Sequence, residues 1–465
     1  MMRKIGIIGV IAFLFAACRP SANVTTPPTA GRANFVNYLA IGDNYTGGFM
    51  NGTLTVSGQL NSFPEMLFEQ FQKIQGSKAA RGPFIQPLLH SDNGYPGPKL
   101  VLGLTHSLCI PNDSSLAPVL FSPFIPDPID AQRYVYPANN GQINNLGVLG
   151  IRVADYGVAG YALVANNLGL PYASRFYNNT AGTPLDELNH AVNNLYPTFF
   201  TMELGMNDVL LYALNGGQGN GTGNAIPIAP GTYNAIDIIP TAFFDSNYDA
   251  ALNAAIITGA SGALLNIPDI TALPYFNAIP ANGLNLARQG QADTLLSYWA
   301  GQSWTKVFQP GANYFIIKDH NNVTRQAVRG ELILMTCPLD SINCAGWGST
   351  VPIPDSLVLT TDEIQFIRSA VTAYNSFIQF EAQRHHLAYV DINSFFSSLQ
   401  TGYAYNGITY NTQFIANGAF SLDGINPTQR GYALIANKVI KTINQFYGST
   451  ITLLDVNKYH GIDFP

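Results

Sequence analysis

Residues 38–46 read Tyr-Leu-Ala-Ile-Gly-Asp-Asn-Tyr-Thr: a short apolar run, then a glycine, then a polar turn. A buried strand of a parallel sheet has this pattern, because both of its faces are covered by other elements. Similar runs occupy residues 143–148, 199–204, 262–267 and 386–392, and helical patterns lie between them at 61–75, at 246–258 and after Thr360. Strands that alternate with helices predict an α/β fold, in which a parallel sheet has helices on both faces.

Two of the expected helices have recognisable starts. Thr360 and Glu363 form a capping box. The helix behind this box places five apolar residues on one face: Ile364, Ile367, Val371, Tyr374 and Ile378. Asn426 followed by Pro427 predicts the start of the last helix, with the asparagine as N-cap and the proline at the first helical position.

The sheet and its helices are expected to form one domain over residues 35–447, followed by a C-terminal extension at 448–465. Three stretches depart from the alternation and are interpreted as insertions. They are a Pro-, Gly- and Ser-rich segment at 77–140, a glycine-rich loop at 215–233, and a segment at about 300–358. Within the last of these we predict a β-hairpin at 312–335, around His320-Asn321-Asn322.

The composition excludes several classes of protein. The chain has 465 residues, with 22 Lys and Arg against 28 Asp and Glu, and only 11 % of its residues are charged. Soluble domains usually have roughly 25 % charged residues, and disordered chains combine high charge with low hydrophobicity. With 47 % apolar residues and a formal net charge of −6, the chain is neither disordered nor suited to neutralise nucleic-acid phosphates.

The four cysteines are too few for a disulfide-dense scaffold. Cys337 and Cys344 lie seven residues apart in a loop-like stretch. They either pair in an oxidising compartment or remain two free thiols. Cys109 is left over and has no His or Cys cluster beside it, so the sequence indicates no metal site and no cofactor.

The first residues have the pattern of an export signal. Positive Arg3 and Lys4 precede an apolar run at 5–17, which is shorter than the about 20 residues of a membrane span. The run ends in Ala-Ala-Cys18 and resembles a bacterial lipoprotein signal, in which the cysteine becomes the lipidated first residue. The alternative is an ordinary secretory signal followed by a chance cysteine. Residues 1–17 are thus interpreted as a signal peptide and 18–34 as a tether.

Four segments, in chain order, resemble the block motifs of the SGNH (GDSL-like) hydrolases. They are Ile-Gly-Asp-Asn-Tyr-Thr at 41–46, Asn-Leu-Gly-Val-Leu-Gly at 145–150, Gly-Met-Asn-Asp at 205–208 and Asp-Gly-Ile-Asn-Pro at 423–427. Three further segments resemble the long lipoprotein members of this family from Bacteroidetes-type bacteria: 61–64, 266–276 and 430–437. The resemblance covers about residues 35–447 and implies a flavodoxin-like three-layer α/β/α fold.

The resemblance also implies roles for particular residues. In this family a serine after the first strand attacks the ester, a histidine in the last block takes its proton, and an aspartate three residues earlier orients that histidine. The orienting aspartate corresponds to Asp423. The oxyanion donors correspond to the backbone N–H groups of Asn44 and Gly150 and the side chain of Asn207. Asn44, however, stands in place of the serine, and Asn426 stands in place of the histidine.

An amide is neither a nucleophile nor a general base at neutral pH, so these two asparagines favour a pseudoenzyme. Thr46 is a weak candidate for a substitute nucleophile, and His385 and His386 are more simply interpreted as a helix-end or surface pair. Two hypotheses remain open. The first is a degenerate hydrolase that binds a ligand or serves as a subunit of an outer-membrane barrel or envelope complex. The second is an active esterase, lipase or carbohydrate deacetylase with an unusual nucleophile.

Lipidation of Cys18 would place the protein on the outer membrane. Either the periplasmic or the cell-surface face is open to it. In some of these bacteria an acidic cluster after the lipidated cysteine acts as a signal for export to the cell surface. No such cluster follows Cys18, and its absence favours the periplasmic face.

Overall fold

A computed structural model describes residues 27–109, 114–131, 143–163, 166, 170–221, 234–416 and 418–462. The predicted signal peptide at 1–17 and Cys18 lie outside these residues, as does most of the glycine-rich stretch at 215–233. Within the described part of the chain, no helix has the length and apolar character needed to cross a membrane.

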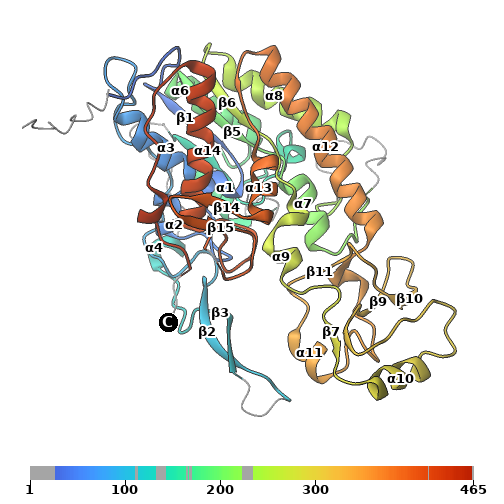
Figure 1. Ribbon diagram of the computed structural model, residues 1–465. Helices are drawn as coiled ribbons and strands as arrows, with labels where there is room; N and C mark the ends of the chain where they lie inside the picture. Colours follow the sequence, from blue (N-terminus) through green and yellow to red (C-terminus); the bar gives the residue numbers. More distant parts are fainter. Residues whose placement is uncertain are drawn as a thin grey trace, which may run out of the picture.

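The core of the molecule is a five-stranded parallel sheet (Figure 1). Its strands are β1 (Tyr38–Gly42), β4 (Asn145–Gly147), β5 (Phe199–Glu203), β6 (Ser261–Leu265) and β13 (Ala388–Val390). All five strands were predicted from apolar runs, and each prediction is confirmed to within a few residues. The spatial order is β13-β6-β5-β1-β4. Counted along the chain this is the order 2-1-3-4-5, which is the flavodoxin-like order of doubly wound sheets.

Helices cover both faces of this sheet (Figure 1). On one face α3 (Phe63–Gln72) packs against α14 (Gln429–Tyr447). On the other face α6 (Pro184–Leu195), α8 (Thr241–Ile256) and α12 (Thr361–Arg384) form a row. The five apolar residues predicted to share one face of α12 are all buried. The predicted α/β fold with a covered parallel sheet is therefore confirmed.

Helix α12 begins at the predicted capping box, where the backbone N–H of Thr360 donates to the Glu363 carboxylate at 2.7 Å. The prediction that Asn426 caps the last helix is wrong. Helix α14 has Thr428 as its N-cap, and the Thr428 hydroxyl accepts from the backbone N–H of Gly431 at 3.1 Å. Asn426 lies two residues before this cap, and its side-chain amide donates a hydrogen bond to Asp423 instead.

The remaining elements surround the sheet or lie in insertions. The helices are α1 (Asn44–Gly47), α2 (Val56–Leu60), α4 (Pro128–Ala131), α5 (Leu170–Phe176), α7 (Asn207–Leu214), α9 (Pro274–Asn277), α10 (Gln289–Tyr298), α11 (Leu339–Cys344) and α13 (Ile392–Thr401). The paired strands are β2 (Leu100–His106) with β3 (Ser114–Leu120), β7 (Leu284–Leu286) with β8 (Gly311–Asn313), β9 (Ile316–Lys318) with β10 (Thr324–Gln326), β11 (Leu332–Ile333) with β12 (Val358–Leu359), and β14 (Tyr403–Tyr405) with β15 (Ile408–Tyr410).

Two of the predicted insertions form projecting structures (Figure 1). The segment predicted at 77–140 contains the long antiparallel hairpin β2–β3. The third insertion is a small lobe with apolar clusters of its own, and the hairpin predicted at 312–335 is confirmed as β9–β10. This lobe begins near Ile279, about twenty residues before the predicted boundary at 300, because Ile279 belongs to its apolar cluster.

Both ends of the described chain pack against the domain. The backbone N–H of Arg32 donates to the carbonyl of Tyr447, Ala33 is fully buried, and Ile451 and Leu454 are buried as well. The predicted tether at 18–34 is therefore wrong for residues 29–34, and the predicted extension at 448–465 belongs to the domain core as far as 456. Small and apolar side chains in both segments supply the contacts that a free tether lacks.

The disulfide of the structure joins Cys109, after β2, to Cys344 at the end of α11. Neither alternative left open for Cys337 and Cys344 matches the structure, because Cys344 is paired with Cys109 and only Cys337 is a free thiol. Cys337 is a free thiol that packs in the apolar cluster of the lobe beside Ile333, whereas Cys344 is exposed and faces the β2–β3 hairpin. The two side chains thus lie in different environments despite their short separation in sequence.

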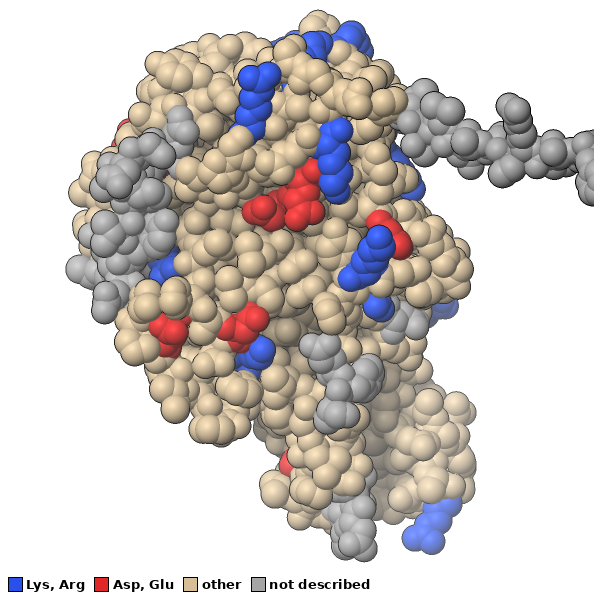
Figure 2. All heavy atoms as spheres, turned by 90° about the vertical axis from the view of Figure 1, so that its left-hand side faces the viewer, with Lys and Arg blue, Asp and Glu red and all other residues tan. Residues whose placement is uncertain are grey.

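The surface reflects the low content of charged residues. Figure 2 shows one face on which Lys, Arg, Asp and Glu side chains are few and separated by wide uncharged areas.

Candidate functional site

The four segments that were singled out in the sequence meet at the carboxyl edge of the sheet. Asn44 follows β1, Gly150 follows β4, and Asn207 follows β5, so parallel pairing brings them to the same edge. Asp423 and Asn426 lie in the loop before α14. Ligands of open α/β sheets bind outside this edge, where the strand order reverses.

Asn44 is the centre of the arrangement. Its side-chain oxygen Oδ1 accepts a hydrogen bond from the backbone N–H of Gly150 at 2.8 Å and another from the Asn207 amide at 3.3 Å. The Asn207 amide also donates to the carbonyl of Ile151 at 3.0 Å, and the side chains of Asn44 and Asn207 are both buried. The N–H of Gly150 and the side chain of Asn207 are two of the three donors that the sequence analysis assigned to an oxyanion. The oxygen of Asn44 occupies both of them.

Gly150 can present its N–H in this direction because its backbone is in the left-handed region, with φ +74°. A residue with a Cβ atom adopts this conformation only at a cost. Glycine is therefore the residue that this position of the loop after β4 accepts without backbone strain.

Asp423 is saturated by donors from its own loop and from the loop after β1. Its Oδ1 accepts from the backbone N–H groups of Ile425 at 2.8 Å and Asn426 at 2.7 Å. Its Oδ2 accepts from the N–H of Gly52 at 2.9 Å and from the side-chain amide of Asn426 at 3.0 Å. The aspartate thus orients the side chain at 426, but that side chain is an amide. The remaining oxygen of Asn426 is buried and has no donor among the described residues.

Three further contacts hold the 421–426 loop against the segment after β1. The Tyr45 hydroxyl donates to the carbonyl of Ile425 at 3.0 Å, and the backbone N–H of Asn51 donates to the Ser421 hydroxyl at 2.9 Å. The backbone N–H of Leu422 donates to the side-chain oxygen of Asn51 at 3.1 Å. The first and last of the four segments are therefore joined directly, although they lie about 380 residues apart.

Two buried carboxyl groups lie directly behind Asn44, and the sequence analysis did not identify them. The Glu203 carboxylate accepts from the backbone N–H groups of Asp43 at 3.3 Å and Thr46 at 3.2 Å. Burial raises the pKa of Glu203 to about 7. Burial and the neighbouring Glu203 raise the pKa of Asp43 well above its usual range, and neither side-chain oxygen of Asp43 has a hydrogen-bond partner among the described residues. Burial therefore favours the protonated form of both carboxyl groups.

Thr46 does not supply a nucleophile. Its side chain is 0 % exposed, and its hydroxyl donates to Glu203 at 2.9 Å. A hydroxyl enclosed in this way has no path to a substrate, so the structure does not support Thr46 as a substitute for serine.

Asp208 is a third buried acid whose role the sequence analysis did not identify. Its carboxylate accepts from the backbone N–H groups of Val153 at 2.8 Å and Ala154 at 3.2 Å, and burial raises its pKa to about 7. These bonds fix the loop that carries Gly150. The Asn-Asp pair at 207–208 thus serves two purposes: the first residue contacts Asn44, and the second holds the neighbouring loop in place.

His385 and His386 lie at the other edge of the sheet, because α12 ends there immediately before β13 begins. His385 lies 3.4 Å from Glu381. Together with Asp249 these two residues have the spacing of a metal site, but Arg384 lies 2.7 Å from both carboxylates. Arg384 therefore pairs with both carboxylates of the cluster, and the two histidines lie at the end of a helix, as the sequence analysis expected.

Comparisons of the chain with protein-family models, with curated proteins and with solved structures found no match.

Proposed function

We propose that this protein is a lipid-anchored cell-envelope protein of the SGNH (GDSL-like) hydrolase type that no longer hydrolyses esters. In this proposal it uses the domain for binding, or as a subunit of an outer-membrane assembly. One observation carries the proposal: the side-chain oxygen of Asn44 accepts hydrogen bonds from Gly150 and Asn207.

An ester hydrolase needs these donors free for the oxygen of its substrate, because they stabilise the negative charge that develops during attack. Here an oxygen of the protein itself takes them. Asn44 therefore removes two parts of the catalytic machinery in this proposal. It provides no nucleophile, and its side-chain oxygen fills the position where the oxyanion would be bound.

The last loop supports the same conclusion. In a triad the aspartate accepts a hydrogen bond from one ring N–H of the histidine, and the other ring nitrogen stays free as a base. Asp423 makes the corresponding bond, but to the amide of Asn426. An amide nitrogen has no free lone pair for a proton, so the loop keeps the orientation of a triad without its base.

The disulfide between Cys109 and Cys344 supports the envelope part of the proposal. Disulfides persist in exported proteins and are rare where thioredoxin and glutathione keep thiols reduced. A periplasmic or cell-surface position would supply the oxidising environment that this bond requires.

We expect the purified protein to show no measurable hydrolysis of short acyl esters such as p-nitrophenyl acetate. Asn44→Ser alone is expected to remain inactive, because no base takes the serine proton. Asn44→Ser combined with Asn426→His is expected to hydrolyse the ester slowly, since Asp423 and Asn207 already lie in place. Loss of a catalytic serine or histidine lowers kcat by a factor on the order of 10⁶. The gain in kcat from the two replacements together is therefore limited to about this factor.

Asp423→Ala provides the control. It should abolish the activity of the double variant and change nothing in the unmodified protein. Hydrolysis by the unmodified protein that is lost in Asp423→Ala would reject the proposal and favour an active hydrolase. If the double variant folds but stays inactive, the substrate position beside Asn44 is closed. The protein would then serve as a structural subunit and would not bind a ligand at this site.

Cys18→Ser is expected to move the protein from the membrane fraction to the soluble fraction of the cell envelope, because it removes the acyl chains. Each buried CH₂ of such a chain contributes roughly 0.8 kcal/mol to membrane binding. Immunoblots of fractionated cells measure the effect, with Cys337→Ala as a matched cysteine replacement that leaves the anchor in place. Retention of Cys18→Ser on the membrane would show that another segment or a partner holds the protein.

A further inference from the structure

One face of the β2–β3 hairpin is apolar over three successive cross-strand pairs, up to the polar pair His106 and Ser114. Residues directly opposite each other in an antiparallel pair share a face of the sheet, and so do alternate residues along one strand. The register pairs Leu100 with Leu120, Leu102 with Pro118, and Leu104 with Leu116. We call these six residues the leucine face.

Much of the leucine face is open to solvent. Leu104 is 61 % exposed, Leu116 is 43 % exposed and Leu120 is 63 % exposed. The hairpin projects from the body of the molecule in Figure 1, and the bond between Cys109 and Cys344 ties its far end to α11. A contiguous apolar surface that is held in place by a covalent link indicates a binding surface.

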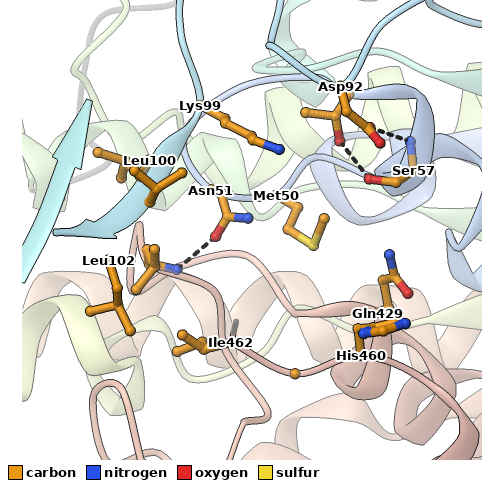
Figure 3. Close-up of a pocket in the computed structure, with 14 residues that line it drawn as sticks. Met50, Asn51, Ser57, Asp92, Lys99, Leu100, Leu102, Gln429, His460 and Ile462 are labelled. Carbon is orange, nitrogen blue, oxygen red and sulfur yellow. Dashed lines mark hydrogen bonds between the residues drawn. The ribbon is translucent and has the colours of Figure 1, made fainter. Parts of the chain in front are cut away.

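The base of the leucine face leads into a pocket of about 440 Å³, which Leu100 and Leu102 also line. Figure 3 shows Ser57, Asp92 and Lys99 on one side of this pocket, Gln429 and His460 on the opposite side, and the two leucines at one end. The polar lining contains one acidic and one basic side chain, so its formal charges cancel. Its other polar groups are amides, hydroxyls and the His460 imidazole.

Several of these polar groups are available to a ligand. Among the described residues, the Lys99 ammonium has no hydrogen-bond partner and only lies 5.9 Å from the ring of Phe121. The Gln429 amide likewise has no partner there. Asp92 accepts from the backbone N–H of Ser57 at 2.8 Å through one oxygen, which fixes the carboxylate and leaves its second oxygen free. Donors and acceptors therefore converge on the pocket from both walls.

We propose that this pocket and the leucine face together bind an amphiphile that has an uncharged sugar head group and a single alkyl or acyl chain. Sugar hydroxyls both donate and accept, so they match a lining of amide, carboxylate and ammonium groups with no net charge. The chain lies along the leucine face, which extends for roughly 13 Å over five residues of each strand. Asn44, Asn207 and Asn426 do not line the pocket, so the proposal goes beyond the proposed function and does not depend on it.

The position of the hairpin argues against the anchoring membrane as the occupant of this face. Residues 29–32 lie against the end of α14, next to Tyr447, whose hydroxyl bonds to Gly262 at the amino edge of the sheet. The hairpin starts beside Asn51, at the carboxyl edge. Residues 29–32 thus lie near the amino edge of the sheet, whereas the leucine face begins at the carboxyl edge.

Isothermal titration of the mature protein with dodecyl maltoside, below its critical micelle concentration, tests the proposal. We expect saturable binding with one site, and weaker binding of hexyl maltoside and of maltose. Leu104→Asn should weaken the binding of dodecyl maltoside about tenfold, because it removes apolar surface from the chain site. Gln429→Ala should weaken dodecyl maltoside and maltose alike. Ile257→Asn is the matched control, since Ile257 is 73 % exposed at the end of α8, and it should change nothing.

Three results would overturn the proposal: absence of saturable binding, equal weakening by Leu104→Asn and Ile257→Asn, or binding of dodecylphosphocholine as tight as that of dodecyl maltoside.

Light scattering of the same samples measures whether the protein self-associates. Self-association that Leu104→Asn abolishes, without any binding of dodecyl maltoside, would assign the leucine face to a second copy of the chain instead. Thermal unfolding of each variant confirms that the protein remains folded.

Discussion

Raising the pH from about 4.5 to 8 is expected to lower the free energy of unfolding by an amount on the order of 3 kcal/mol through the buried pair of Glu203 and Asp43. Burial raises the pKa of Glu203 to about 7 in the folded protein, above the ordinary value of 4.5. Between these two values the folded state keeps a proton that the unfolded state has released. The stability is therefore complete below about pH 4.5 and is lost as the pH rises towards 7.

Asp43 and Asp208 act in the same direction, because burial raises the pKa of each in the folded state. The contribution of Glu203 can be isolated with Glu203→Gln. The glutamine oxygen can still accept from Thr46 and from the backbone N–H of Asp43, while its NH₂ group donates to the Asp43 carboxyl. We expect this variant to remain folded and to lose less stability than the parent protein between pH 5 and pH 8.

Urea unfolding at several pH values measures this effect. Asp293→Asn, at an exposed position of α10, is the control and should keep the pH dependence of the parent protein. A stability that stays constant or rises over this range, or a Glu203→Gln variant with an unchanged pH dependence, would contradict the raised pKa of the buried pair.

Asp208→Ala is expected to destabilise the fold by roughly 3 kcal/mol or more, because it leaves the backbone N–H groups of Val153 and Ala154 without their acceptor. An unsatisfied buried donor costs about 1–3 kcal/mol, and two are created here. The same change should loosen the loop that carries Gly150, and faster hydrogen exchange of the Gly150 amide would report this.

Asp186→Ala is the matched control for Asp208→Ala. The Asp186 carboxylate also accepts a backbone N–H, from Thr183 at 2.9 Å, but it is exposed at the start of α6. Water replaces an exposed acceptor, so this change should cost only about 1 kcal/mol. Equal losses of stability in both variants would show that the burial of Asp208 does not matter.

The local features of this protein follow from short stretches of sequence. The five strands are apolar runs that end at turns, and the start of α12 is a capping box between residues three positions apart. Such patterns depend on the period of the backbone and on contacts between near neighbours, and for this reason they can be read without a structure. The alternation of strands and helices then restricts the sheet to a parallel one with covered faces.

The candidate site could be predicted only in part. The order of the four segments indicates that Asn44, Gly150, Asn207 and Asp423 meet at one edge, because parallel strands place their carboxyl ends together. That the Asn44 oxygen takes the donors of Gly150 and Asn207 depends on the direction of one side chain. No local pattern specifies this direction.

The features that were missed all join residues that lie far apart in the chain. Glu203 comes to lie behind Asp43 because the register of β1 and β5 pairs Gly42 with Glu203, and enclosure by both layers of helices then raises the pKa of the two acids. Cys109 and Cys344 pair across 235 residues because a hairpin and a lobe from separate insertions meet. Burial and contact of this kind are properties of the packed molecule. A sequence supplies the residue types for them, but the distances arise only when the sheet, its helices and its insertions assemble.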